Sequence, residues 1–306
     1  MSGYSATFID SLPVAMPELK PGHPLSATAE ILPYRHFSVL FSKARKLPVC
    51  TAVNIDGETF QAINRDTDKW IFDARMPEAS QLGNEFYKET GQAFHRGHVV
   101  RRLDPCWGKV REAAKAMLDT FHFTNSCPQH AKFNPRIWLE LERNVLEKGS
   151  VAFAEKISVF AGPILRPEDK PFIKKICGEY ILVPESFWKV IIWKKENGNK
   201  YAVGFIQSQS KLIQRFLYQG PRKARETKSE DYFEHLQFKD GNVYQVGIGE
   251  IEHLTGLDLK LQQLNQPVAP AAPEPLTINT NAAVKNRSGF RAGELPYLNI
   301  SGLVLD

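Results

Sequence analysis

Short apolar runs of strand length begin at Tyr34 and recur along most of the chain, separated by polar and turn-forming residues. Such runs, rich in Val, Ile, Phe and Tyr, are typical of β-strands. Asp56-Gly57 favours a tight hairpin turn between the second and third runs, and residues 196–199 are expected to be the loop between the last two. The predicted strands cover residues 37–41, 49–55, 59–63, 70–72, 121–125, 157–161, 187–194 and 201–206.

Other segments have helical composition or helical spacing. In residues 137–146, apolar side chains occur at positions 137, 138, 141, 145 and 146, which share one helical face. The remaining predicted helices cover residues 110–118, 209–217 and 248–254. Because strands and helices follow one another without regular alternation, the predicted fold class is α+β with a central antiparallel sheet.

The chain divides into three parts by composition. Residues 1–33 are rich in Pro, Ser and Ala without a sustained period, which predicts an extended N-terminal arm. Residues 34–265 form the predicted domain, and residues 266–306 are a Pro/Ala spacer followed by a C-terminal tail. The tail has enough Arg, aromatic and Leu residues to dock on the domain or on a partner. We also expect that the chain can form a homodimer.

Composition excludes several classes of protein. A chain of 306 residues with 42% hydrophobic and 24% charged residues is folded and not disordered. No run approaches the roughly 18 apolar residues of a membrane span, and no leader pattern opens the chain, so we expect a cytoplasmic protein without a membrane partner. The four cysteines form no C-x-x-C pair and are expected to be reduced and packed. A net charge of +5 permits a polyanionic partner.

The densest cluster of chemically active residues is His95-Arg96-Gly97-His98, which we expect in a loop, followed closely by Arg101 and Arg102. Histidine, with a pKa near 6.5, suits a general base at neutral pH, and arginines hold phosphate. Further along the chain, the spacing of Asn134, Trp138 and Glu142 places them on one helical face. An amide oxygen and a carboxylate on one face suit a hard cation such as Mg²⁺, which needs few protein ligands.

Taken together, these motifs resemble the DNA/RNA non-specific endonucleases of the ββα-metal class, which include mitochondrial endonuclease G. The matching residues are Arg96-Gly97-His98, Asn125 with Pro128-Gln129, Asn134, Trp138 and Leu141-Glu142, at the family's spacing. The resemblance implies a ββα-metal fold and hydrolysis of DNA and RNA without sequence specificity, leaving 5′-phosphates. It also implies one Mg²⁺. Independently of the resemblance, a histidine that reached the metal would make Mn²⁺ a substitute. The implied roles are general base for His98, metal ligand for Asn134, action through metal-bound water for Glu142, orientation of the site for Asn125 and phosphate contact for Arg96.

The chain departs from the family pattern at two points. His95 stands where the family has Asp, and a neutral imidazole is expected to lower affinity for Mg²⁺ unless its side chain points away. The family's upstream arginine has no clear match, so Arg65 and Arg75 are both candidates. A basic stretch with interleaved aromatics is a predicted nucleic-acid track, although a solvated surface explains it equally well; it contains Lys211, Arg215 and Arg222.

Three alternatives stay open. The chain is either an active nuclease or a weakened relative that binds nucleic acid and cuts it poorly. His95 and His98 can also form a zinc site with Cys106 or His122. Asn134 before a proline is also a good helix N-cap. Because an unspecific nuclease endangers its own cell, we expect its activity to be controlled by an inhibitor, by an activating protein or by the tail.

Overall fold

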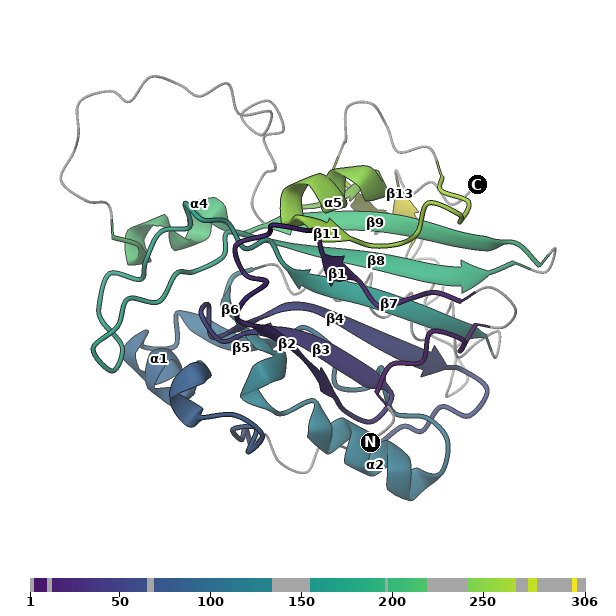
Figure 1. Ribbon diagram of the computed structural model, residues 1–306, viewed down its shortest axis with the longest axis horizontal. Coiled ribbons are helices and arrows are strands. Elements are labelled where there is room, and N and C mark those ends of the chain that lie inside the picture. Colours follow the sequence, from purple (N-terminus) through teal and green to yellow (C-terminus); the bar gives the residue numbers. More distant parts are fainter. Residues whose placement is uncertain are drawn as a thin grey trace.

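A seven-stranded antiparallel sheet forms the centre of the computed structural model, in the order β10-β9-β8-β7-β4-β3-β2 (Figure 1). The structure describes residues 3–9, 13–64, 69–133, 155–195, 198–218, 242–267, 275–279 and 299–301. The strands of the sheet are β2 (Ala29–Pro33), β3 (Phe37–Ser42), β4 (Leu47–Asp56), β7 (Lys156–Pro163), β8 (Ser186–Lys194), β9 (Lys200–Ser208) and β10 (Val243–Val246).

Smaller elements surround this sheet. The short strands are β1 (Glu18–Leu19), β5 (Phe94–His98), β6 (Ser126–His130), β11 (Leu257–Asp258), β12 (Thr277–Asn279) and β13 (Asn299–Ser301). The helices are η1 (Glu78–Ser80), α1 (Asn84–Glu89), α2 (Val110–Asp119), η2 (Phe123–Asn125), α4 (Ser210–Ile213), η4 (Gln214–Phe216) and α5 (Ile248–Thr255). The predicted α+β class with a central antiparallel sheet is therefore confirmed.

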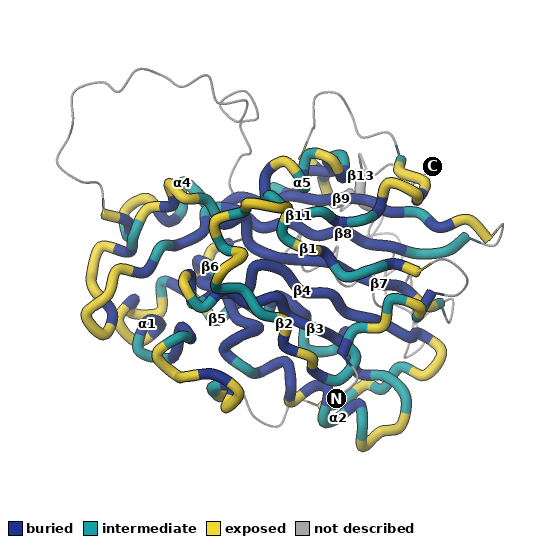
Figure 2. The backbone as a smooth tube through the Cα atoms, viewed as in Figure 1, coloured by how far each residue is buried: buried dark blue, intermediate teal, exposed yellow. Residues whose placement is uncertain are grey.

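Strand β4 lies inside the sheet, between β7 and β3, and is buried along its whole length (Figure 2). Successive side chains of a strand point to opposite faces, so its residues enter two separate clusters. Cys50 and Ala52 join the larger core, which also contains Phe94, Phe123 and α5. Val53 and Ile55 join a second core, with Phe37 and Val100. Both faces of β4 are thus covered, which explains why its apolar run is nearly continuous.

The Asp56-Gly57 hairpin is wrong, and so are two of the predicted strands. The Asp56 carboxylate accepts hydrogen bonds from the backbone N–H groups of Glu58 and Thr59, at 3.0 and 3.4 Å, and this turn leads the chain away from β4. The free edge of β4 pairs with β7 instead. Residues 59–63 and 70–72 consequently form only single bridges, Phe60 with Trp107 and Ile71 with His122.

Three predicted helices are confirmed, and one further predicted strand is wrong. The predicted helices at 110–118, 209–217 and 248–254 correspond to α2, α4 with η4, and α5. The predicted strand at 121–125 is instead the 3₁₀ turn η2 leading into β6, because Asn125 N–H bonds back to the carbonyl of His122 at 2.9 Å. The predicted helix at 137–146 lies outside the described residues.

Both terminal regions contact the domain. Within the predicted N-terminal arm, β2 forms the sheet edge beside β3, and β1 pairs with β11. Near the C-terminus, Leu276 is only 1% exposed, and its N–H donates to the carbonyl of Val243 at 2.8 Å. The chain is therefore held on β10 at Leu276, and docking of the tail that follows stays a prediction. The predicted domain boundaries themselves stay predictions.

Two further expectations concern the whole chain. Within the described ranges, no helix is long and apolar enough to cross a membrane. All four cysteines are free thiols, and Cys50, Cys106 and Cys127 are buried as expected. Cys177 is exposed, contrary to the expectation, because it occupies a hairpin turn with a φ of 48°.

Candidate active site

The two halves of the motif that the sequence separates by almost thirty positions are neighbouring strands. Strands β5 and β6 form an antiparallel pair in which Arg96 lies opposite Pro128, Gly97 opposite Cys127 and His98 opposite Ser126. The expected loop around residue 96 is therefore wrong, since Phe94 to His98 is a strand. The pair is anchored on the larger core by Phe94, which is 2% exposed. This burial fixes the register of the motif.

Gly97 is required by the way the two strands meet. The side chain of Gln129 lies across Gly97, and a Cβ atom placed there would come within 2.2 Å of the Gln129 Cδ atom. Any larger residue would push Gln129 away or open the pair. The Arg-Gly-His and Pro-Gln motifs therefore belong to one packing arrangement, with His95 opposite Gln129 and on the same face as Gly97.

His98 projects from the other face of β5, and its ring packs against two aromatic side chains that also contact each other. The ring centroid lies 4.5 Å from that of Trp70 and 4.8 Å from that of Phe121, which meets it edge-on at 87°. Trp70 in turn contacts Phe121 and Phe123. These contacts restrict the rotation of a half-buried imidazole, as a general base requires for a fixed direction of proton transfer.

Arg96 shares the face of β5 that carries His98, because the two are separated by one residue. Its Nη1 donates to the side-chain oxygen of Asn84 at 3.0 Å, and its guanidinium lies 5.4 Å from the ring centroid of Tyr87. Both partners belong to α1, so this helix orients the guanidinium beside the imidazole. Only Asn84 is bonded to the guanidinium among the residues described here, which leaves Arg96 suited to bind a phosphate.

Asn125 locks the backbone on either side of the site. Its amide oxygen accepts the N–H of Val100 at 2.9 Å, and its Nδ2 donates to the carbonyls of Val100 and Thr120, both at 3.0 Å. The side chain is completely buried. Its amide group bonds to the backbone of the fold, which agrees with the predicted orienting role, and that role stays a prediction.

A chain of buried hydrogen bonds connects η2 to residues outside it. The Tyr34 hydroxyl donates to the Asp73 carboxylate and also contacts the Thr124 hydroxyl at 2.5 Å, one residue before Asn125. Arg75 donates to the same carboxylate through Nε, at 2.9 Å from Oδ1. Arg75 is therefore engaged in a structural ion pair, which argues against it as the family's upstream arginine. The other candidate, Arg65, lies outside the described residues.

We predict that Asp73 makes the stability of the protein depend on pH in strongly acid solution. Burial acts to raise the pKa of its carboxyl, but hydrogen bonds from Arg75 and Tyr34 outweigh burial and lower this pKa to about 2. A carboxyl with a depressed pKa stabilises the fold above its unfolded value, near 3.9, and that stabilisation is lost as the pH falls through about 2. In urea unfolding between these two pH values, the wild type should lose stability more steeply than Asp73→Asn.

The matched control for this experiment is Glu58→Gln, which removes an exposed carboxylate. Its pH profile should follow that of the wild type. Parallel profiles for the wild type and Asp73→Asn would show that the buried ion pair contributes nothing to the acid sensitivity.

The remaining predicted site residues lie at several places. His95 is exposed on the face of β5 opposite His98. Arg102 is half-buried, and its Nη1 donates to the carbonyl of Ile63 at 3.0 Å, so this guanidinium holds the fold together. Arg101 is half-buried, whereas Lys211 and Arg215 are exposed on α4 and η4. The predicted residues Asn134, Glu142 and Arg222 lie outside the described residues.

The chain is firmly held up to the position before Asn134. Phe133 is 7% exposed and packs on Phe187 with ring centroids 5.1 Å apart. The end of β6 is fixed by Gln209, whose side chain accepts the N–H of His130 at 2.8 Å and donates to the carbonyl of Pro128 at 3.1 Å. The predicted metal-binding segment therefore starts from a rigid end of the strand pair.

The donor chemistry of the predicted metal ligands fits a hard cation, since both the amide of Asn134 and the carboxylate of Glu142 offer oxygen. The zinc alternative finds no support in the described part of the chain, where no group of three or more His, Cys, Asp or Glu side chains is placed to hold a metal. Burial raises the pKa of the Cys106 thiol to about 12, and its Sγ donates to the carbonyl of Arg102. His122 bonds to the carbonyl of Asp119 at 2.8 Å.

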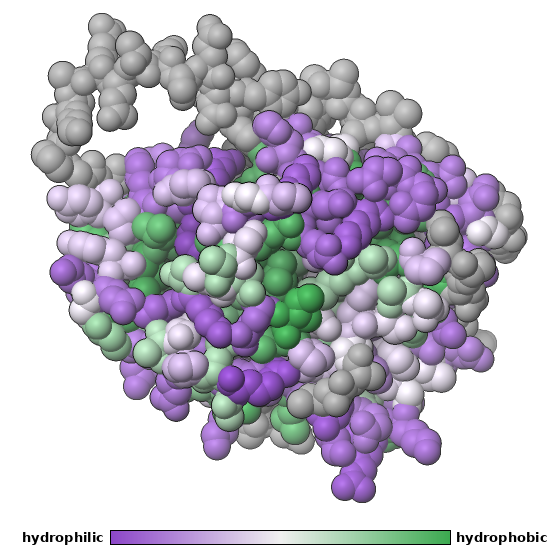
Figure 3. Space-filling view, viewed as in Figure 1, coloured by the Kyte–Doolittle hydropathy of each residue, from purple (hydrophilic) through white to green (hydrophobic). Residues whose placement is uncertain are grey.

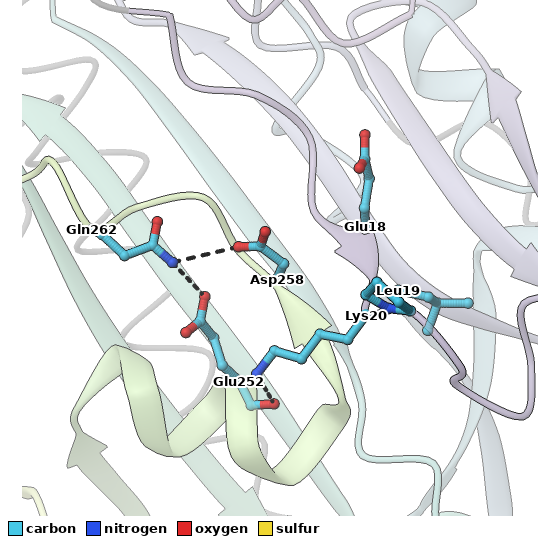
Figure 4. A pocket seen from close by; sticks show the side chains of 7 residues that line it. Glu18, Leu19, Lys20, Glu252, Asp258 and Gln262 are labelled. Atoms are coloured by element: carbon cyan, nitrogen blue, oxygen red, sulfur yellow. Dashed lines mark hydrogen bonds between the residues drawn. The ribbon is translucent and has the colours of Figure 1, made fainter.

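A surface depression of about 550 Å³ lies elsewhere, where β1 and β11 meet α5 (Figure 4). Its polar groups bind one another: Gln262 Nε2 donates to Glu252 and Asp258, both at 3.4 Å. None of its lining residues belongs to the β5–β6 pair. On the face seen in Figure 3, apolar residues gather in the middle and are surrounded by polar ones. Because the depression is lined by none of the motif residues, we place the candidate active site at β5 and β6.

Sequence reasoning missed the residues that hold the site in place. Trp70 and Phe121 pack against His98, Asn84 accepts a hydrogen bond from Arg96, and Gln209 accepts one from the backbone of β6. Each of these residues is far from its partner along the chain. No periodicity or short motif links them, so only folding reveals these contacts.

This chain is similar to one family of proteins and to several individual proteins. Residues 17–265 match the family described as DNA/RNA non-specific endonuclease. Protein y4fB of Sinorhizobium fredii is 38% identical over 225 residues, which make up 68% of this chain and 32% of that protein. A mitochondrial nuclease of Saccharomyces cerevisiae is 24% identical over 259 residues, 81% of this chain and 69% of that protein. The chain thus spans about a third of the first relative, at 32%, and 69% of the second.

Among solved structures, one described as the EndoG/EndoGI complex, concerning the mechanism of EndoG inhibition, is similar to this chain. The TM-score is 0.54 at 16% sequence identity, with 77% of this chain and 89% of that chain covered. At this level of identity the match shows a shared fold. It agrees with the ββα-metal nuclease fold expected from the motifs.

Proposed function

Because this chain belongs to the DNA/RNA non-specific endonuclease family, we propose that it hydrolyses both DNA and RNA with a divalent metal ion, using His98 as general base. Membership confirms the resemblance inferred from the motifs and makes the protein an endonuclease, a hydrolase of nucleic acids. The observation that carries the proposal is the β5–β6 register, which places Arg96 and His98 on one face of a strand. We propose both DNA and RNA as substrates, Mg²⁺ as the metal ion, and Arg96 and His98 as residues that act in the reaction.

In the proposed reaction, His98 removes a proton from a water molecule as its oxygen attacks phosphorus. A new P–O bond forms while the bond from phosphorus to the 3′-oxygen breaks. The departing 3′-oxygen takes up a proton and leaves as a 3′-hydroxyl, and the other product carries a 5′-phosphate. The contacts with Trp70 and Phe121 keep the imidazole in one orientation throughout. Fixing a base in this way lowers the entropic cost of reaching the transition state.

Arg96 would bind the non-bridging phosphate oxygens in this reaction, with Asn84 and Tyr87 holding its guanidinium in place. Asn134 would hold the Mg²⁺, assisted through water by Glu142. When bound, the divalent ion neutralises charge on the phosphoryl oxygen and on the leaving oxygen. Asn125 keeps β5 and η2 together, so that the arginine and histidine stay in register.

The proposal is tested by incubating the full chain with supercoiled plasmid and with structured RNA in Mg²⁺, in EDTA, and in EDTA followed by excess Mg²⁺. We expect cleavage of both substrates, complete loss in EDTA and recovery on adding metal back. End-labelling of the products before and after phosphatase treatment identifies the 5′-phosphate. Absence of cleavage in every condition, with binding retained, would establish the alternative of a weakened nucleic-acid-binding protein.

Position 95 bears directly on that alternative, since the family has Asp there. His95 is exposed and lies on the face of β5 opposite His98, which supports the interpretation that it points away from the site. Charges separated by solvent are strongly screened. We therefore predict that the wild type and His95→Asp give superimposable activity curves when Mg²⁺ or Mn²⁺ is titrated. A lower Mg²⁺ requirement in the variant would instead show that His95 weakens metal binding.

The remaining parts of the proposal concern partners. One similar structure is described as a complex that explains EndoG inhibition, and we propose that an inhibitor protein, or release by an activating protein, controls this chain as well. Formation of a homodimer and a cytoplasmic location stay predictions. Size-exclusion chromatography with light scattering tests the first, and fractionation of cells tests the second.

A further inference from the structure

Three segments form a small sheet that packs against Phe94 of β5, at the left of Figure 1 between α1 and α4. Phe172 N–H donates to the carbonyl of Ile181 at 2.7 Å, and Ile173 N–H donates to that of Phe216 at 2.8 Å. Residues 171–173 are thus bonded to residues 180–182 on one side and 216–218 on the other. A hairpin turn at Cys177-Gly178, both with positive φ, connects the first two segments.

The two faces of this small sheet differ sharply in burial. Phe172, Ile181 and Leu217 point inward, with exposures of 2%, 4% and 1%. Ile173, Tyr180 and Tyr218 point outward, with exposures of 51%, 51% and 48%. The rings of the two tyrosines are neighbours, with centroids 6.3 Å apart and planes tilted by 37°. We call Ile173, Tyr180 and Tyr218 the tyrosine face.

Two cations, Lys175 and Arg215, lie on aromatic rings at or next to the tyrosine face. The Lys175 ammonium lies 5.2 Å from the Tyr180 ring centroid, and the Arg215 guanidinium lies 4.6 Å from that of Phe216. Two carboxylates of this region are already neutralised: Glu89 pairs with Lys174 at 2.5 Å and Glu179 pairs with Lys46 at 2.6 Å. Exposed cations beside exposed aromatic rings are the arrangement that binds unpaired nucleotides, with bases on the rings and phosphates on the cations.

The tyrosine face is joined to the active-site strand through its buried side. The Phe94 ring contacts Phe172 and Phe216, with centroid distances of 6.4 and 5.4 Å. Phe94 begins β5 and His98 ends it, about 13 Å further along at roughly 3.3 Å per residue. The small sheet is therefore packed on the end of β5 that lies about 13 Å from His98.

We propose that the tyrosine face is a binding subsite for unpaired bases of the nucleic-acid substrate, with Tyr180 and Tyr218 as stacking platforms and Lys175 as a phosphate contact. This inference rests on the proposed function and goes beyond it, because it specifies single-stranded nucleic acid as the ligand at this surface. In a duplex the bases stack on each other and their flat faces are not accessible, so the tyrosines favour single strands. A protein partner is the competing occupant, and the positive charge favours nucleic acid.

The test measures binding without cleavage. A short fluorescein-labelled oligodeoxythymidylate and a duplex of similar length are titrated with protein in EDTA, and fluorescence anisotropy is recorded. The Tyr180→Ala, Tyr218→Ala double variant should lose single-strand affinity by about tenfold or more, and duplex affinity by much less. Tyr180→Phe with Tyr218→Phe should retain single-strand affinity, because the ring is kept. Ile31→Ala removes a similarly exposed apolar side chain, at 54%, from the edge strand β2 and should bind like the wild type.

A second measurement needs no tyrosine variant. Cys177 is the exposed thiol of the four cysteines, and it lies in the turn that leads to Tyr180. An environment-sensitive fluorophore attached there should respond to the oligodeoxythymidylate at the concentrations that produce the anisotropy change. A silent fluorophore, equal losses for single strand and duplex, or unchanged affinity in the alanine variant would overturn the proposal. Failure of the proposed function appears separately, as absence of cleavage by the wild type in Mg²⁺.

Discussion

Replacing His98 by alanine should lower the rate of phosphodiester cleavage by on the order of 10² to 10⁴, the usual contribution of a general base. The change removes the proton acceptor while leaving Arg96 anchored on Asn84 and Tyr87. Affinity for nucleic acid, measured in EDTA, should therefore stay close to that of the wild type. Single-turnover cleavage of a labelled substrate with saturating enzyme gives the chemical rate directly.

Two controls separate chemistry from packing in this variant. Alanine also removes the ring that packs against Trp70 and Phe121, so we expect a loss of stability. Thermal unfolding measures this loss. Adding imidazole to the solution should restore part of the cleavage rate by occupying the space left by the ring. His253→Ala removes an exposed histidine from α5 and should cleave normally. A cleavage rate for His98→Ala near that of the wild type would refute the assignment.

Replacing Asn134 by alanine should abolish cleavage even in excess Mg²⁺, because the proposed direct ligand of the metal is lost. The alternative is that Asn134 only caps a helix, in which case alanine would cost about 1 kcal/mol of stability and leave the chemistry intact. Cleavage is measured over a wide range of Mg²⁺ concentrations, and thermal unfolding of the same samples gives the stability.

Two further substitutions at this position distinguish metal binding from capping. Serine is as good an N-cap as asparagine but lacks the amide oxygen, so Asn134→Ser should keep the stability and still be inactive. Aspartate keeps both the cap and an oxygen ligand, so Asn134→Asp should recover metal-dependent cleavage. Full activity in the serine variant would leave only the capping role.

The family, the α+β class and most of the central strands follow from the sequence alone. The motif residues Arg96-Gly97-His98 and Pro128-Gln129 stand at fixed spacing, and such spacing is preserved whatever the remainder of the chain does. Apolar runs long enough to cross a sheet, such as the one in β8, predict strands because their β-branched and aromatic side chains fit a pleated surface. These are local properties, so the order of residues is sufficient to read them.

The tertiary structure decided the pairing of these segments and the surroundings of the proposed catalytic residues. Asp56-Gly57 favours a hairpin locally, but the Asp56 carboxylate binds the following backbone and β4 pairs with β7, burying a long apolar strand on both faces. The same principle brings Trp70 to His98 and Tyr180 to Tyr218. Contacts between residues remote in the chain depend on how the whole chain buries its apolar surface, and no local pattern encodes that outcome.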